Sequence, residues 1–212
     1  MIESSLLLSV RTALVTTVGA FILGILLARW RMSRHGPVGL IVDGLVILPI
    51  ALPPTVVGVT LLMLLGPSSP ISSIVEILFT WQATVVAAFF VSFPLMYLSC
   101  RAAFDQIEGE LLDLARTYGL TEWRILWKVM VPLAWPGIMA GVLLTFVRAL
   151  GEFGATLMVA GNIPGQTQTL PLAIYVSMER GDSSGAILLS LISVVISLIA
   201  IGTLGVLRNR IR

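Results

Sequence analysis

The sequence is poor in charged residues and in side chains that bind metals. Only 11% of its 212 residues are Asp, Glu, Lys or Arg, against about 25% in an ordinary soluble domain. A single cysteine, Cys100, excludes an intramolecular disulfide framework, and a single histidine, His35, excludes a zinc site built from several His and Cys ligands. The formal net charge of +2 and the lack of a basic run give no reason to expect a nucleic acid partner.

Two catalytic patterns are missing as well. The chain has no Gly-x-x-x-x-Gly-Lys-Ser/Thr loop, whose backbone amides and lysine hold nucleotide phosphates. It also offers no convergent set of nucleophile, base and metal ligands, which an enzyme within a membrane would need. We therefore expect a chain that is not an enzyme and that binds no cofactor or metal.

Apolar residues, by contrast, make up 57% of the sequence. A soluble domain needs polar groups at its boundary with water, so this surplus predicts a protein surrounded by lipid. Five stretches are long enough to cross about 30 Å of hydrocarbon as helices. We therefore predict an all-α fold with about five transmembrane helices in one membrane domain over 1–212, and a sixth short span is left open. The stretches are residues 10–29, 40–65, 82–100, 131–153 and 184–207.

Basic residues are distributed unevenly between the two sides of the predicted membrane domain. If the N-terminus lies outside and five spans follow, ten of the thirteen Lys and Arg residues fall on the inner side. Inner loops of membrane proteins carry such an excess. We therefore expect a multi-pass protein of the inner (plasma) membrane, with the N-terminus outside and the C-terminus in the cytoplasm. The ten residues are Arg29, Arg31, Arg34, Arg101, Arg116, Arg124, Lys128, Arg208, Arg210 and Arg212.

Proline interrupts the second predicted span. Pro53, Pro54 and Thr55 lie near its middle, where each proline removes a backbone donor and frees a carbonyl group. In a membrane, neighbouring protein or a water-lined cavity must satisfy the freed groups, and broken helices are common in transporters. These three residues are candidates for a translocation pathway or gate. A kink that serves only packing is the alternative.

The longest charged stretch is the loop over residues 101–130, between the third and fourth predicted spans. Each half of this loop predicts a short amphipathic helix below the membrane. Gly119 is expected to end the first helix and Thr121 to cap the second. The residues alone leave two interpretations, an interfacial hairpin that anchors the loop or a docking element for a cytoplasmic partner. The apolar positions are Ile107, Leu111, Leu114 and Tyr118 in the first helix and Trp123, Leu126, Trp127 and Met130 in the second.

A family resemblance favours the docking element. Asp113-Leu114-Ala115, three residues, Gly119, nine residues and then Val129-Met130-Val131-Pro132 resemble the signature loop of ABC importer permeases. That loop reads Glu-Ala-Ala, three residues, Gly, nine residues, then Ile-x-Leu-Pro. The resemblance implies a fold like that of type I ABC importer permeases, in which coupling helices insert into a cleft of the ATPase subunit. It assigns this coupling role to Glu110, Asp113, Leu114, Ala115, Arg116 and Gly119.

A longer resemblance narrows the substrate. The segments Arg148–Thr156, Gly161–Gly165 and Thr167–Pro171 are similar to those of molybdate permeases, and Leu52–Gly58 and Phe93–Met96 agree with this. The resemblance implies import of molybdate or tungstate, with sulfate or another oxyanion as the alternative because sulfate permeases are near relatives. It also implies a second copy of the chain, two copies of an ATPase that binds ATP and Mg²⁺, and an extracytoplasmic oxyanion-binding protein.

Two charged residues lie near the outer end of the fourth predicted span. Arg148 and Glu152 are four positions apart and can pair on one helix face. Ionisable groups at membrane depth are usually functional or paired, so we expect a gate or a structural ion pair. The rival from another class is an ion-coupled secondary transporter, which would need carboxylates within its spans. Only Asp43 and Glu152 are available for that role.

Overall fold

The structure is a computed structural model that describes all residues except 1, 35, 68, 71–75 and 211–212. His35 and Arg212 therefore lie outside the described residues, as do the side chains of Arg208 and Arg210. The described part of the chain is helical and contains no strand, which confirms the all-α prediction. The helices are α1 (Ile2–Met32), α2 (Pro37–Ala51), α3 (Pro54–Leu65), α4 (Trp81–Asp105), α5 (Gly109–Thr117), α6 (Glu122–Ile125), the π-helical turn η1 (Leu126–Met130), α7 (Val131–Leu133), α8 (Trp135–Leu150), α9 (Gly154–Ala160), α10 (Leu170–Glu179) and α11 (Ser183–Arg210).

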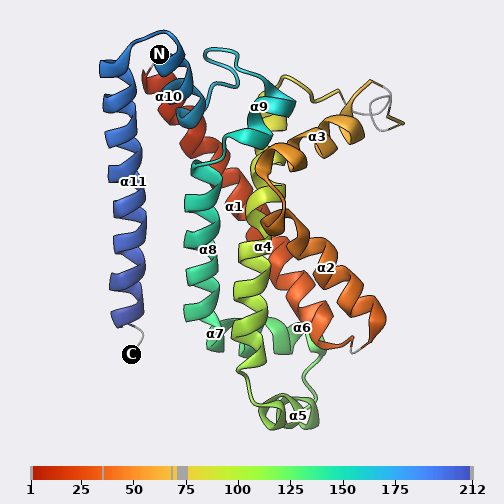
Figure 1. Cartoon of the computed structure of the whole chain (residues 1–212). Coiled ribbons are helices and arrows are strands. Elements are labelled where there is room, and N and C mark those ends of the chain that lie inside the picture. The colour runs from red at the N-terminus through yellow and green to blue at the C-terminus, as the bar shows by residue number, and fades with distance from the viewer. Residues whose placement is uncertain (1, 35, 68, 71–75, 211–212) are drawn as a thin grey trace.

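In the described residues, α1, α4 and α11 are long and apolar enough to cross a membrane. Two bent helix pairs bring the number of spans to five if each pair counts as one. The expected number of about five is therefore confirmed. Figure 1 shows that α1, α4, α8 and α11 run lengthwise through the molecule, with the N-terminus at one end and α5 at the other.

The second predicted span, 40–65, consists of two helices. α2 and α3 meet at an angle of 118°, and Leu52 between them is extended. Pro53 and Pro54 have no N–H to donate to the carbonyl groups of Pro49 and Ile50, so the helical ladder cannot continue. The prolines were expected to interrupt this span, and the break lies at Leu52 and Pro53, between α2 and α3.

The fourth predicted span, 131–153, also divides. The helical segment that begins at Glu122 ends at Leu133, and α8 continues from Trp135 after a bend of 79°. Pro136 cannot donate to the carbonyl group of Pro132, which accounts for the break. At the far end, α8 stops at Leu150 and a separate helix, α9, follows.

Small residues let α8 approach α4 closely. A Cβ added to Gly137 would lie 2.6 Å from the Cβ of Ala103, and one added to Gly141 would lie 2.7 Å from the Cβ of Ser99. Residues four positions apart share a helix face, so this is a contact of small residues on both helices, as is typical of membrane proteins. Cys100, in the same part of α4, is fully buried.

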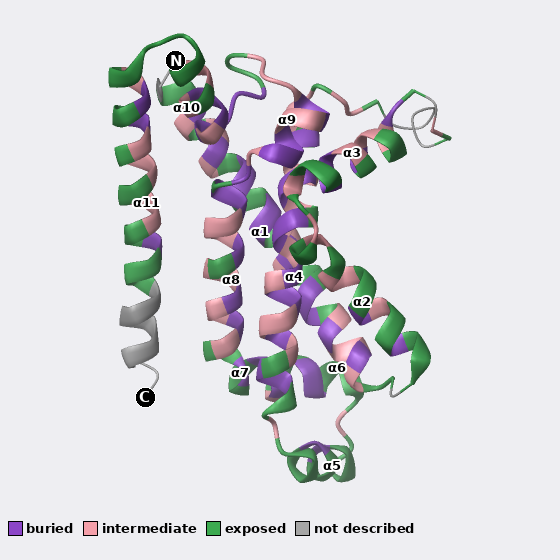
Figure 2. Ribbon diagram, viewed as in Figure 1, coloured by how far each residue is buried: buried purple, intermediate pink, exposed green. Residues whose placement is uncertain are grey.

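The outward surface is largely apolar. In Figure 2 the buried residues line the inner faces of α1, α4 and α8, whereas exposed residues dominate α2 and α11. Large exposed side chains on α11 include Ile187, Leu191 and Leu198. Contact between such a surface and water is unfavourable, so we expect lipid or a second membrane subunit to cover it.

Candidate functional site

The loop between α4 and α8 folds at Gly119 as the sequence predicts. Gly119 has a φ of 77°, in the left-handed region where glycine is favoured. Its N–H donates to the carbonyl of Arg116 (2.9 Å), and the N–H of Leu120 donates to the carbonyl of Ala115 (3.2 Å). These two bonds form a Schellman motif that satisfies the last carbonyl groups of α5. The expectation that glycine ends this helix is confirmed.

The second half of the loop begins at the predicted cap. The Thr121 side chain accepts a hydrogen bond from the backbone N–H of Arg124, at 3.4 Å. From Glu122 the chain is helical through α6, η1 and α7, and these elements run across the end of the bundle (Figure 1). Ile125, Leu126 and Met130 are buried against it. The loop is thus one short helix, α5, attached by a tight turn to a second helix packed on the membrane helices.

Three of the four apolar positions predicted for the first loop helix do not face the bundle, whereas Ile107, just before α5, is partly buried against the main core. Leu112 and Ala115 are the buried residues of this helix. Leu111, Leu114 and Tyr118 are exposed, and Tyr118 keeps 79% of its accessible surface. The periodicity of the sequence identified an apolar face of the helix. It did not indicate whether that face packs against the rest of this chain or stays exposed. The exposed stripe at the end of the molecule fits a surface that a partner covers.

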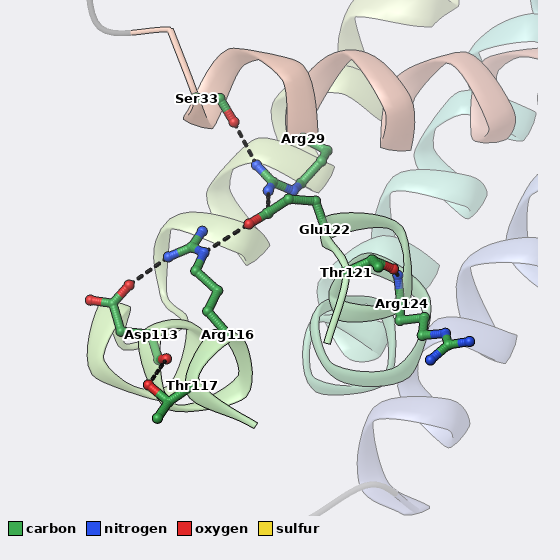
Figure 3. Close-up of polar contacts among 8 residues, drawn as sticks. All are labelled: Arg29, Ser33, Asp113, Arg116, Thr117, Thr121, Glu122 and Arg124. Carbon is green, nitrogen blue, oxygen red and sulfur yellow. Dashed lines mark hydrogen bonds and ion pairs between the residues drawn. The ribbon is translucent and has the colours of Figure 1, made fainter. Parts of the chain in front are cut away.

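An ion-pair cluster connects this loop to α1 (Figure 3). The Arg116 guanidinium donates to Asp113 within α5 at 2.5 Å, and its Nε donates to the Glu122 carboxylate at 2.8 Å. The other oxygen of Glu122 accepts from Arg29 in the last turns of α1, and Arg29 also donates to Ser33 at 2.7 Å. Arg116 first, and Arg29 with it, holds the pKa of Glu122 below its usual range. Likewise, Glu122 and Asp113 raise the pKa of Arg116.

Sequence reasoning found part of this cluster. The residues assigned to ATPase coupling lie where the loop is exposed, apart from Ala115, which is buried. Asp113 and Arg116 are three positions apart in a helix, which signals a pair. Glu122 and Arg29 were missed as functional residues, because they are 93 positions apart and no local pattern connects them.

A second ionic cluster ties α1, α2 and α4 together. Asp43 of α2 is buried and accepts from Arg31 Nε at 2.9 Å, from Arg101 Nη1 at 2.6 Å and from the Tyr97 hydroxyl. Arg31 lies in the last turn of α1, and the other two partners lie in α4. A buried carboxylate with two guanidinium partners acts as a fixed link between helices, because separating the charges would leave them unpaired.

Two of the candidate pathway residues, Pro54 and Thr55, lie against the start of α9. A Cβ added to Gly154, at the start of α9, would lie 3.3 Å from the Pro54 Cβ and from the Thr55 Cγ2. Pro53 and Thr55 are exposed and Pro54 is partly buried. The chain thus brings the α2–α3 break against the segment that follows α8, although the two are about a hundred residues apart in sequence.

The predicted Arg148–Glu152 pair forms, with an Arg148 Nη1 to Glu152 Oε2 distance of 2.9 Å. Glu152 is not on the α8 face, because α8 ends at Leu150. The Glu152 carboxylate, only 2% exposed, also accepts from the N–H of Ala155 at 2.9 Å. It therefore caps α9 while it neutralises Arg148, and the helix N-terminus favours this negative charge.

The described residues contain no group of three or more His, Cys, Asp and Glu side chains that could hold a metal ion. Their ionic clusters join carboxylates to arginines, so the chemistry of this site is electrostatic attachment between helices.

Comparison with known proteins gives this arrangement a family. Residues 20–212 match the family described as binding-protein-dependent transport system inner membrane component. The chain is 43% identical over 185 residues to the putative molybdenum transport system permease protein YvgM of Bacillus subtilis, covering 84% of this chain and 81% of that protein. It is 36% identical over 205 residues to the molybdenum transport system permease protein ModB of Escherichia coli K12, covering 93% and 89%.

A solved structure agrees at the level of fold. A chain of the MetNI methionine ABC transporter, in an inward-facing conformation, superposes with a TM-score of 0.76. The match covers 100% of this chain and 96% of that one, at 16% sequence identity. The fold is thus that of an ABC importer permease, as the signature loop predicted. The helical arrangement, the loop and the sequence relatives agree, and the chain belongs to the family of binding-protein-dependent transport system inner membrane components.

Proposed function

We propose that this chain is the membrane-spanning subunit of an ATP-driven importer that carries molybdate or tungstate into the cytoplasm. The two relatives described above are named for molybdenum transport, and together they match most of the chain. In this proposal residues 1–212 form one transmembrane domain that catalyses no reaction. ATP and Mg²⁺ bind to a separate ATPase.

The observation that carries the proposal is the exposed face of α5. Leu111, Leu114 and Tyr118 stand at the end of the bundle, on a helix fixed by the Gly119 turn. Exposed apolar side chains at the water-facing end of a membrane protein call for a protein partner rather than for lipid. The ATPase subunit is that partner, and Glu110, Asp113 and Arg116 supply charges at the rim of the contact.

The orientation follows from the same end of the molecule. The C-terminal ends of α1 and α4, together with α6, lie at the same end of the molecule as α5 (Figure 1). These segments carry Arg29, Arg31, Arg101 and Arg124. The excess of basic residues belongs on the cytoplasmic side. This orientation puts α5 where ATP is available, and it leaves the N-terminus outside.

Two copies of the chain are proposed to enclose the pathway at their two-fold axis, because so few spans enclose little space alone. Pro53, Pro54 and Thr55, close to Gly154, are proposed to form the pathway or its gate, with Arg148 and Glu152 fixing α8 to α9. An extracytoplasmic oxyanion-binding protein delivers the substrate. Tight binding then resides in that protein, which allows the permease to release the anion quickly.

The secondary-transporter alternative is weakened by the ion pairs. A coupling-ion site needs a carboxylate that is free to take up and release its ion. Asp43 is bound to Arg31 and Arg101, and Glu152 to Arg148 and the start of α9. Neither carboxylate is available without breaking a link between helices.

The test is ATP hydrolysis by the permease, its ATPase and its binding protein, reconstituted together in liposomes. Stimulation by molybdate or tungstate, at concentrations where sulfate has no effect, would support the proposal. Stimulation by sulfate alone would retain the importer and replace the substrate. If no ATPase co-purifies with the intact chain, the importer function itself is refuted.

A further inference from the structure

Few side chains of α5 pack against the rest of the chain. Leu112 and Ala115 are its buried residues, and an open cavity of about 550 Å³ lies beside it between α4 and α8. Glu108 and Leu111 line this cavity on one side, and Leu133 and Pro136 on the other. Apolar contacts are not directional, so Leu112 and Ala115 alone would let α5 slide or tilt without moving the helices above it.

One polar link crosses from α5 to another helix. Among the described residues, the only side-chain hydrogen bond or ion pair that leaves α5 joins Arg116 to Glu122. Glu122 uses its second oxygen to bind Arg29 of α1 (Figure 3). A single carboxylate thus stands between two guanidinium groups, one on α5 and one on a membrane-spanning helix. Charge-assisted bonds of this kind fix direction as well as distance.

The link continues beyond Arg29. Two positions later, Arg31 holds Asp43 of α2 at 2.9 Å. Asp43 also binds Arg101 of α4 at 2.6 Å. The end of α1 is therefore joined to the loop by Arg29 and to α2 by Arg31. α2 leads to the break at Pro53, where the candidate pathway residues lie.

We propose that Glu122 is a positioning residue that transmits the movement of α5 to α1 and, through Arg31 and Asp43, to the broken α2–α3 pair. This inference rests on the proposed function, because α5 moves only if an ATPase docks on it. Because the link is a chain of ion pairs, a displacement of α5 displaces the ends of α1 and α2 with it. Without Glu122, ATP hydrolysis would continue, but the movement of α5 would not reach α1.

A purely structural role makes a different prediction. Ion pairs exposed to solvent contribute little to stability, and the Glu122 and Arg116 side chains are 55% and 44% exposed. Arg29 is only 16% exposed, but without Glu122 it keeps its hydrogen bond to Ser33. Its loss is therefore expected to leave the fold and the ATPase contact intact. Asp105 provides a matched control, because its side chain is 58% exposed and it pairs with Arg101, also a residue of α4, at 3.8 Å. Its pair does not join the loop to another helix.

The experiment compares Glu122→Gln, Arg29→Gln, the double variant and Asp105→Asn in the reconstituted complex. Molybdate uptake and ATP hydrolysis are measured in the same liposomes. We expect each of the first two variants to lower uptake per ATP hydrolysed by about threefold or more, in the range that single residues on a coupling route produce. The double variant should fall no further than the worse single one, because both changes remove the same link. Asp105→Asn should match the wild type.

Three results would overturn the inference. Uptake per ATP could be unchanged in Glu122→Gln, or the effects of Glu122→Gln and Arg29→Gln could simply add. The ATPase could also fail to co-purify with both variants, which would make Glu122 and Arg29 docking or folding residues. These results differ from failure of the proposed function, in which the wild-type complex itself shows no molybdate-dependent hydrolysis or uptake.

Discussion

The contact between α3 and α9 can be tested by adding one methyl group to α3, with the substitution Gly58→Ala. A Cβ added to Gly58 would lie 2.8 Å from the Cα of Ala155 and 2.8 Å from the Cβ of Met158. The first of these atoms belongs to the backbone, so a rotamer change cannot relieve the clash. We predict that Gly58→Ala pushes α3 away from α9. Gly44→Ala is the control, because Gly44 lies inside the neighbouring helix α2 with no atom within 4 Å of such a Cβ.

The comparison of the two variants isolates the packing effect. Replacing glycine by alanine inside a helix stabilises it by about 1 kcal/mol in either position. Overpacking of a tight contact costs about 1–3 kcal/mol. Because the helix contribution cancels, Gly58→Ala should be less stable than Gly44→Ala by about 1–3 kcal/mol. Equilibrium unfolding in mixed micelles with increasing dodecyl sulfate measures this difference. Equal midpoints for the two variants would show that α3 and α9 do not pack as described.

Three further predictions concern the ionic clusters and the loop. Asp43→Asn leaves buried Arg31, 8% exposed, without its carboxylate and should cost about 3 kcal/mol of stability; an unchanged unfolding midpoint would refute this. Gly119→Ala forces alanine to a φ of 77° and should destabilise the turn by about 1–2 kcal/mol. Faster amide exchange at the end of α5 would report it, and Gly109→Ala, with open space around it, should not show it. The lowered pKa of Glu122 means that its ion pairs stabilise the loop above pH 4.5, its ordinary pKa, and are lost as the pH falls through the lowered value. Amide exchange in α5 should rise with acid in the wild type, whereas in Glu122→Gln it should not depend on this ionisation.

The elements that sequence predicted well are those set by short-range chemistry. Gly119 and Thr121 sit at helix ends because of backbone conformation and capping, which a few neighbouring residues decide. The apolar stretches marked the membrane helices because length and composition alone meet the demand of lipid. The signature loop was found for the same reason, since its spacing lies within twenty residues of chain.

The elements that sequence missed depend on partners far along the chain. A proline indicates that a helix is interrupted, but the 118° angle at Pro53 depends on α9 receiving α3. Glu152 was expected on a helix face, yet it caps the next helix instead. The sequence did not single out Glu122, because its ion pair is with Arg29. These two residues come close only in the folded bundle. Asp43 likewise had no arginine beside it in sequence.

The buried position of Cys100 has a practical consequence. The only thiol of the chain is closed off from solvent between helices, so the natural protein is already a silent background for thiol labelling. A cysteine introduced at Leu114 or Tyr118, both exposed on α5, would then be the single reactive site in each copy. In the proposed dimer with its ATPase, spin labels or fluorophores attached there would report the separation of the two α5 helices during ATP hydrolysis, with no native residue removed from the core.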